Sequence, residues 1–232
     1  MSEKTIIELK NVTKVFYLNN ILPIKVLDNV SLKFKEGHYY SIIGPSGAGK
    51  STLLSIIGCL DYPTSGKVFI EGTDVTKLSE DELANIRGKK IGFVFQLFNL
   101  ISVLTAYENV ELPMIFAGVD EEERKRRVNE LLDMVGLSNR KNHRPLEMSG
   151  GEQQRVAIAR ALALNPKIIV ADEPTGNLDS KTGEKIMNII DNLHKNEGKT
   201  IILVTHDIKV AKHAEFLIRI RDGKIEGIEE NK

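Results

Sequence analysis

The stretch Gly44–Ser51, with the sequence GPSGAGKS, lies between the apolar run Tyr40–Ile43 and the helix-like stretch STLLSIIG. It fits the pattern G-x-x-x-x-G-K-[S/T]. Glycines let the backbone curl so that its N–H groups point at phosphate oxygens, and the following helix adds the positive end of its dipole. Lys50 is expected to reach the β- and γ-phosphates, and Ser51 to ligate Mg²⁺. The residues predicted to bind ATP here are Gly44, Pro45, Ser46, Gly47, Ala48, Gly49, Lys50, Ser51 and Thr52.

Further short, nearly unbroken apolar runs are typical of strands buried on both faces of a parallel sheet. Strand and helix signals alternate along the chain, which predicts an α/β fold. We expect a P-loop NTPase core with a mostly parallel sheet, an N-terminal antiparallel β subdomain, and a helical subdomain at about residues 97–155, all within one domain of residues 1–232. The predicted strands are Thr5–Lys10, Lys25–Lys35, Tyr40–Ile43, Ile91–Phe95, Ile168–Ala171 and Ile201–Val204; the predicted helices include Glu121–Val135, Gly150–Leu164 and Ser180–Lys195.

Polar residues follow the four core strands directly. Gly44 follows one, Gln96 another, Asp172–Glu173 a third and Thr205–His206 the fourth. Ligands of open parallel sheets bind beyond the carboxyl ends of the strands, so these residues are expected to meet at one rim. Asp172 can hold Mg²⁺, and Glu173 can orient and polarise an attacking water. An acidic helix start before Pro174 is the alternative for this pair taken alone.

A serine–glycine turn opens a later helix, with the sequence MSGGEQQR at Met148–Arg155. Ser149 and Glu152 fit a capping box, and a glycine-rich helix start can also bind an anion. The turn resembles the signature of the ATP-binding cassette (ABC) family, usually LSGGQ, and the resemblance continues through RVAIARALALNPKIIVADEPTGNLDS. It implies a head-to-tail homodimer around two ATP molecules, in which Ser149, Gly150 and Gly151 contact the γ-phosphate held by the other subunit. Met148 and Glu152 depart from the usual signature, and we expect Glu152 to turn back toward the cap.

The family resemblance implies roles for further residues. Gln96 resembles the Q-loop glutamine, a ligand of Mg²⁺ and of the attacking water, with catalytic Glu173 and the switch histidine His206 beside it. The metal set is then Ser51, Gln96 and Asp172. The stretch Asn177, Leu178, Asp179 resembles the D-loop at the dimer interface. Phe16 resembles the aromatic residue that stacks on adenine, with Tyr17 as the alternative.

The resemblance implies an ATPase that uses ATP and Mg²⁺ to drive a separate polytopic permease. That permease would dock near Gln96 and the helical subdomain and hold the cassette at the cytoplasmic face of the membrane. The segment IGFVFQLFNLISVLTAYENVELP is similar to the subgroup typified by MacB and LolD, which serves lipoproteins, peptides or macrolides. A cell-division cassette like FtsE is the alternative within the family, and a P-loop phosphotransferase is the alternative outside it.

Composition agrees with this interpretation. Lys plus Arg number 32 and Asp plus Glu also number 32, so the chain lacks the basic excess of a dedicated nucleic-acid binder, and no nucleic acid is expected as a partner. The single cysteine, Cys59, cannot form an internal disulfide, which is consistent with a reducing compartment. No run approaches the roughly 18 consecutive apolar residues of a membrane span.

Overall fold

Two sheets form the framework of the computed structural model, which describes residues 4–19 and 21–231. The antiparallel sheet has the order β2-β1-β4-β5, and the six-stranded sheet has the order β10-β9-β3-β8-β7-β6. The first contains β1 (Thr5–Leu18), β2 (Leu22–Lys35), β4 (Ser65–Ile70) and β5 (Thr73–Asp74). The second contains β3 (Tyr39–Ile43), β6 (Ile91–Val94), β7 (Ile168–Asp172), β8 (Thr200–Thr205), β9 (Phe216–Arg221) and β10 (Lys224–Glu230).

The larger sheet is parallel from β9 to β6, and only its edge strand β10 is antiparallel. Alternate residues of its central strands therefore face opposite layers. Ile202 and Val204 of β8 pack with α1 and the antiparallel sheet, whereas Ile201 and Leu203 pack with the helices of the other layer. Because both faces are covered, the strands read as unbroken apolar runs. The predicted α/β class, parallel core and antiparallel sheet are confirmed.

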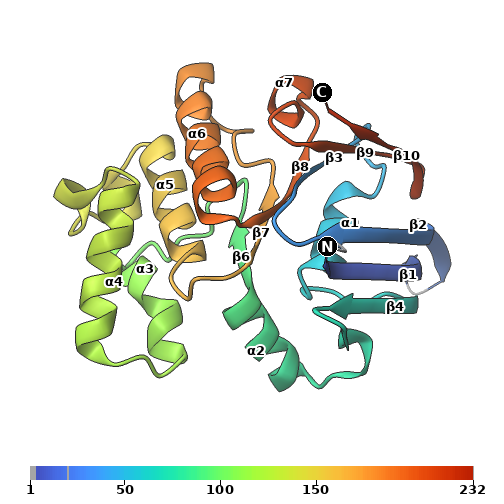
Figure 1. The fold of residues 1–232 in the computed structure, drawn as a ribbon, viewed down its shortest axis with the longest axis horizontal. Coiled ribbons are helices and arrows are strands. Elements are labelled where there is room, and N and C mark those ends of the chain that lie inside the picture. Colours follow the sequence, from blue (N-terminus) through green and yellow to red (C-terminus); the bar gives the residue numbers. More distant parts are fainter. Residues whose placement is uncertain (1–3, 20, 232) are drawn as a thin grey trace.

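The helices cover the two faces unequally. Figure 1 shows α3 to α6 on one side of the larger sheet and α1 with the antiparallel sheet on the other. Between β6 and β7, the described chain forms helices and turns only. The helices are α1 (Lys50–Ile57), α2 (Glu80–Lys90), α3 (Ala106–Phe116), α4 (Glu121–Met134), α5 (Gly150–Ala161), α6 (Ser180–Glu197) and α7 (Ile208–Ala211), with 3₁₀ turns at Val75–Lys77, Ser138–Arg140 and Pro145–Glu147.

Several predicted boundaries were wrong, and several elements were not predicted. Strand β1 continues past Lys10 to Leu18 because it pairs with β2 along that extension. Helix α5 ends at Ala161 rather than Leu164, and α6 continues to Glu197, where Gly198 ends it with φ +64°. The strands and helices that were not predicted are β4, β5, α2, α7 and the hairpin of β9 and β10. Helix α3 lies in the stretch that was predicted only in general terms to be helical. None of the helices in residues 4–19 and 21–231 is both long and apolar enough to span a bilayer.

Candidate nucleotide-binding and catalytic site

The predicted convergence at one rim is present. Strands β3, β8, β7 and β6 are adjacent and parallel, so their carboxyl ends share one edge of the sheet. The phosphate loop follows β3, His206 follows β8, and Asp172 ends β7. Gln96 follows β6 after Phe95. The sheet order therefore places the predicted site residues side by side although they are up to about 160 positions apart in the chain.

The phosphate loop has the backbone that its glycines predict. Gly49 caps α1 with φ +98°, a left-handed conformation that a side chain disfavours, and a Cβ there would lie 2.7 Å from the carbonyl oxygen of Val26. The Lys50 ammonium group donates to the carbonyl oxygens of Gly44 and Pro45, both at 2.9 Å. Lys50 is thus held over the loop, while Ser46 and Gly47 are exposed at the helix N-terminus. That arrangement suits a phosphate group.

The Mg²⁺ ligand set is partly assembled. The Ser51 hydroxyl donates to Oδ1 of Asp172 at 3.3 Å, which brings two hard oxygen donors together beside the phosphate loop. Burial raises the pKa of Asp172, with a smaller contribution from Glu173, while the Ser51 hydrogen bond and Lys50 oppose the shift. A divalent cation at these oxygens would favour the charged carboxylate, so the donor set fits Mg²⁺.

The pKa of Asp172 gives a prediction for the nucleotide-free protein. A raised pKa means that the folded state binds the proton more tightly than the unfolded state, so ionisation of Asp172 destabilises the fold. The penalty is absent below the ordinary value of 3.8 and complete above the raised value. Asp172→Asn should therefore raise the melting temperature at neutral pH, by a few °C at most. Differential scanning calorimetry should show this gain shrinking toward zero as the pH falls below 3.8; a gain independent of pH would contradict the explanation.

Glu173 lies in a hydrogen-bonded turn directly after β7. The Nδ1–H of His206 donates to its Oε1 at 2.7 Å, and the Thr205 hydroxyl donates to its Oε2 at 3.2 Å. The Glu173 backbone has φ +45°, an unusual conformation for a residue with a side chain. Glu173 is mostly buried, whereas His206 is largely exposed. The predicted base and the predicted histidine are therefore in direct contact. Thr205, which the sequence placed at the rim without a specific role, completes the group.

Gln96 meets the predicted D-loop rather than the oxygens of Ser51 and Asp172. Its side-chain amide donates to Oδ1 of Asn177 at 3.4 Å, and the side-chain amide of Asn177 donates to the backbone carbonyl oxygen of Gln96 at 3.0 Å. Asp179 caps α6 by accepting from the Thr182 N–H at 3.0 Å. The role of Gln96 toward Mg²⁺ stays a prediction.

The serine–glycine turn packs tightly against the same region. A Cβ on Gly150 would lie 3.3 Å from a Leu178 methyl group, and one on Gly151 would lie 2.3 Å from a Thr182 methyl group. A side chain at Gly151 would therefore require Thr182 on α6 to move. Ser149 is exposed and caps α5. The turn thus forms a capped helix start whose first residue is exposed at the surface.

Glu152 turns back onto this cap, as expected from the sequence. Its Oε2 accepts from both the backbone N–H and the hydroxyl of Ser149 at 2.8 Å, and its Oε1 pairs with Arg140 at 3.2 Å. The backbone N–H of Ser149 is the main reason that the pKa of Glu152 is lowered. The charged carboxylate is thus stabilised by local donors and by Arg140, and it does not project from the turn toward a phosphate.

Glu152→Gln should therefore leave the steady-state ATPase rate within about 3-fold of the parent rate, because glutamine can make the same capping-box contact. A coupled-enzyme ATPase assay at saturating Mg-ATP checks this prediction. A gain of ten-fold or more, which would indicate relief of about 1.4 kcal/mol of transition-state repulsion, would show that Glu152 faces the nucleotide.

The aromatic residue predicted to stack on adenine is not singled out by the geometry. Phe16 and Tyr17 are both exposed near the end of β1. The Lys14 ammonium lies 4.9 Å from the centre of the Phe16 ring and also pairs with Asp61 at 2.6 Å. Phe16 therefore stays a prediction.

The phosphate loop connects a strand to a helix, and the acidic pair follows the second strand along in the sheet. His206 follows the strand that lies between these two. This arrangement defines a P-loop ATPase. The family model for ABC transporters matches residues 27–176. An ABC transporter ATP-binding protein of Thermotoga maritima is 56% identical over 226 residues, covering 97% of this chain and 96% of that protein. The protein belongs to the ABC transporter ATP-binding family. It is an ATPase that uses ATP and Mg²⁺, and its hydrolysis of ATP drives transport.

Two further relatives refine this placement. The dimeric cassette MJ0796 of Methanocaldococcus jannaschii, in a post-hydrolysis state with ADP and Pi, superposes with a TM-score of 0.90 at 54% identity, covering 97% of this chain and 99% of that chain. The macrolide export ATP-binding/permease protein MacB of Brucella melitensis is 48% identical over 225 residues, which are 97% of this chain but 34% of MacB. The MacB-like resemblance is thereby confirmed.

Proposed function

We propose that residues 1–232 form one nucleotide-binding domain, with a helical subdomain at about 97–155, that dimerises head-to-tail and drives a separate permease of the MacB-like subgroup. The meeting of Lys50, Ser51, Asp172, Glu173 and His206 at one rim is the observation that carries this proposal. The dimers of MJ0796 and the permease portion named in MacB support a partner of each kind. The substrates of such a permease would be macrolides, peptides or lipoproteins handled outside the cytoplasm.

Catalysis would be a matter of positioning and electrostatics. Lys50 and the loop N–H groups would hold the β- and γ-phosphates, and Ser51 with Asp172 and Gln96 would hold Mg²⁺, which offsets phosphate charge when bound. Glu173 would orient the attacking water and accept its proton. Through its contact with Glu173, His206 would keep the carboxylate oriented, and it would also reach the γ-phosphate. Ser149, Gly150 and Gly151 would complete the site of the partner subunit.

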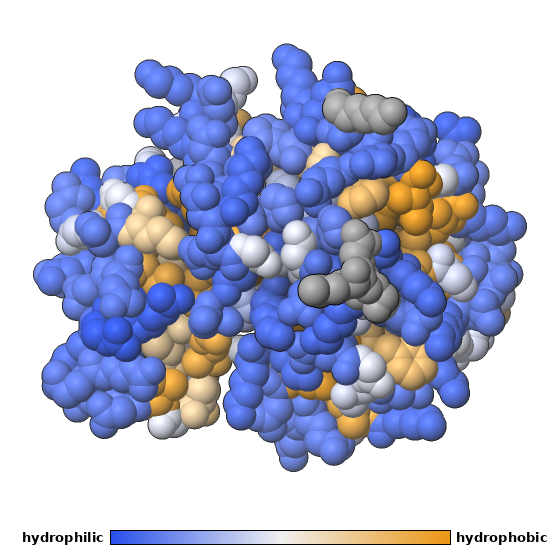
Figure 2. All heavy atoms as spheres, in the orientation of Figure 1, coloured by the Kyte–Doolittle hydropathy of each residue, from blue (hydrophilic) through white to orange (hydrophobic). Residues whose placement is uncertain are grey.

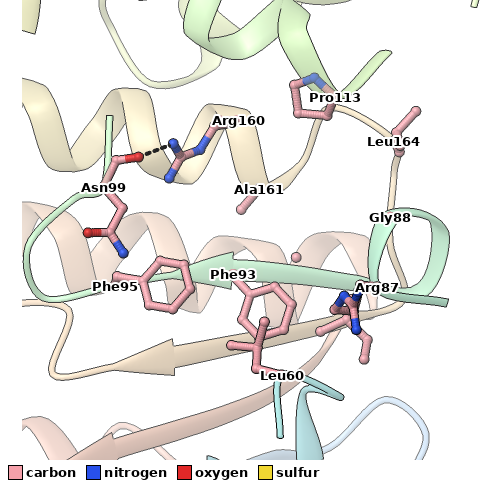
Figure 3. Close-up of a pocket in the computed structure, with 12 residues that line it drawn as sticks. Leu60, Arg87, Gly88, Phe93, Phe95, Asn99, Pro113, Arg160, Ala161 and Leu164 are labelled. Atoms are coloured by element: carbon pink, nitrogen blue, oxygen red, sulfur yellow. Dashed lines mark hydrogen bonds between the residues drawn. The ribbon is translucent and has the colours of Figure 1, made fainter. Parts of the chain in front are cut away.

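The permease would dock in a groove beside the segment that follows Gln96. The groove has a volume of about 370 Å³ and lies between α2, β6, α3 and α5. Its lining is largely apolar and includes Leu60, Phe93, Phe95, Pro113 and Leu164 (Figure 3). Hydrophobic side chains also gather over α3 on the face shown in Figure 2. Two apolar residues of α3, Ile115 and Phe116, are exposed. An amphipathic loop helix of a membrane protein suits such a groove.

Arg160 connects this groove to the catalytic rim. Its guanidinium group donates to the carbonyl oxygen of Phe98 at 2.9 Å and to that of Asn99 (Figure 3), and burial lowers its pKa. Phe98 and Asn99 have φ values of +59° and +50°. Consecutive left-handed residues are unfavourable without such anchoring. A partner in the groove would therefore contact Asn99, which lines it. Arg160 holds Phe98 and Asn99 in one conformation, and both lie just after Gln96 in the chain.

Capture from membranes tests the proposal. The tagged Glu173→Gln variant, loaded with Mg-ATP, should retain a polytopic membrane protein from detergent-solubilised source membranes in stoichiometric amount, as identified by mass spectrometry. Leu60→Glu, in the groove, should lose that partner. Ile228→Glu on β10 is the matched control, because Leu60 and Ile228 are similarly exposed, at 49% and 52%. Capture of soluble proteins only would favour a non-transport cassette.

A further inference from the structure

Gln154 is a buried polar residue on α5, five positions after Ser149. Its side chain is fully buried, and its amide nitrogen donates to the carbonyl oxygen of Pro174 at 2.7 Å. A backbone carbonyl can only accept, so this contact fixes which end of the amide faces Pro174. The Gln154 Oε1 atom then has no hydrogen-bond partner among the residues that the structure describes. An unpaired buried carbonyl is unfavourable, so packing alone gives no reason for an amide here.

The acceptor of this bond belongs to the catalytic turn. Pro174 is buried and directly follows Glu173, whose φ is +45°. Two backbone hydrogen bonds also hold the turn. The Glu173 N–H donates to the carbonyl oxygen of Val204 on β8 at 2.9 Å, and the Gly176 N–H donates to the carbonyl oxygen of Glu173 at 3.0 Å. An unfavourable backbone conformation persists only where its surroundings hold it. Among these three bonds, the one from Gln154 is made by a side chain of another element.

The helix that carries Gln154 also carries the serine–glycine turn. Ser149 caps α5, and its side chain is in turn fixed by Glu152. In the proposed head-to-tail dimer, that turn would contact the ATP held by the partner, whereas Glu173 would act on the ATP held by its own subunit. Gln154 therefore lies on a short, rigid route between the two ATP sites of the dimer.

We propose that Gln154 is a positioning residue that couples the two ATP sites. Through its hydrogen bond to Pro174, it makes the orientation of the Glu173 turn depend on the position of α5. When the start of α5 contacts the ATP held by the partner subunit, Glu173 is aligned for hydrolysis of the ATP held by its own subunit. This inference rests on the proposed head-to-tail site. It predicts an effect on the rate of hydrolysis and on cooperativity, but little effect on ATP binding.

The test compares Gln154→Met with Gln153→Met. Methionine has a similar shape but no donor, and the unpaired Oε1 is removed together with the amide, so the fold should be retained. Gln153 is the matched control: it is the preceding residue of α5, and its amide also donates to a backbone carbonyl, that of Met148, at 3.1 Å. For Gln154→Met, we expect kcat to fall by about 10- to 100-fold, as for a displaced catalytic group, with the KM for ATP within about 3-fold. The Hill coefficient for ATP should fall toward 1. Gln153→Met should change none of the three values.

Parallel variants in the Glu173→Gln background separate this proposal from the site on which it rests. If Glu173→Gln alone forms no ATP-dependent dimer, the head-to-tail site itself is wrong. If it does, Glu173→Gln with Gln154→Met should dimerise at a similar ATP concentration. A kcat for Gln154→Met within two-fold of the parent value, or an equal loss in Gln153→Met, would overturn the coupling role. If the melting temperature of Gln154→Met is well below that of the parent protein, Gln154→Asn replaces it in the test. The asparagine side chain is one methylene shorter, so its amide cannot reach Pro174 in the same way.

Discussion

Glu173→Gln should bind Mg-ATP normally, hydrolyse it about 1,000-fold more slowly than the parent, and accumulate as a dimer. The reduction has the size expected for loss of a general base. Glutamine keeps the shape of the side chain. Its oxygen can still accept from His206, and its amide nitrogen can donate to the Thr205 hydroxyl oxygen, so the turn should keep its conformation. It cannot accept a proton from water, so ATP would remain bound and the closed state would persist. A single-turnover assay measures the rate, and size-exclusion chromatography with light scattering measures the mass.

Glu184→Gln on α6 serves as the control, because it removes one negative charge at a position outside the rim. It should hydrolyse ATP at the parent rate and show no stable dimer. A Glu173→Gln variant that stays monomeric at saturating ATP would contradict the head-to-tail arrangement. One that hydrolyses within ten-fold of the parent rate would remove Glu173 from the role of base.

Lys50→Met should weaken ATP binding by about 100-fold, equivalent to about 2.7 kcal/mol, because charge-assisted bonds to phosphate are lost. In the structure, the ammonium group spans the carbonyl oxygens of Gly44 and Pro45, both of which would lose their donor. Lys50 is buried, so no other cation can easily replace it. Equilibrium titration with a fluorescent ATP analogue measures the affinity, and no hydrolysis above background is expected.

Lys33→Met is the matched control for loss of one positive charge. Lys33 is exposed on β2 and pairs with Glu8 at 3.1 Å, a surface contact of little energetic weight. Its ATP affinity should equal that of the parent protein. Affinity within three-fold of the parent value for Lys50→Met would mean that the loop binds nucleotide through its backbone alone.

The sequence predicted the centre of the fold better than its edges. Runs such as Ile201–Val204 are apolar on both faces because helices and the second sheet cover them, so the parallel core was readable. Strands β9 and β10 were not predicted, because Lys, Arg and Glu lie between their apolar residues and no motif marks the segment. Helix α2 was signalled by Ser79 and Glu82, which form a capping box, but its face toward the core is only Leu83 and Ile86.

The candidate site was predictable where chain neighbours make a motif and not where tertiary contacts decide. Gly44–Ser51 and Asp172–Glu173 carry their chemistry in local order. The side chains that orient Glu173 come instead from two other elements, as Thr205 and Gln154 show. The positive φ of Glu173 is equally invisible in the sequence, since a residue before proline normally prefers an extended backbone.

The position of β3 has a consequence for protein synthesis. This strand, which leads into the phosphate loop, lies between β8 and β9, whose residues are made long after it. A ribosome that has added residue 190 has produced Lys50 and Glu173, yet the strand that holds them in one sheet does not exist. Long-range pairing of this kind delays folding until the distant partner is available. A nascent chain that has not yet reached β8 would therefore have no functioning ATP site, and an active ATPase would form only after β8 and β9 have been made.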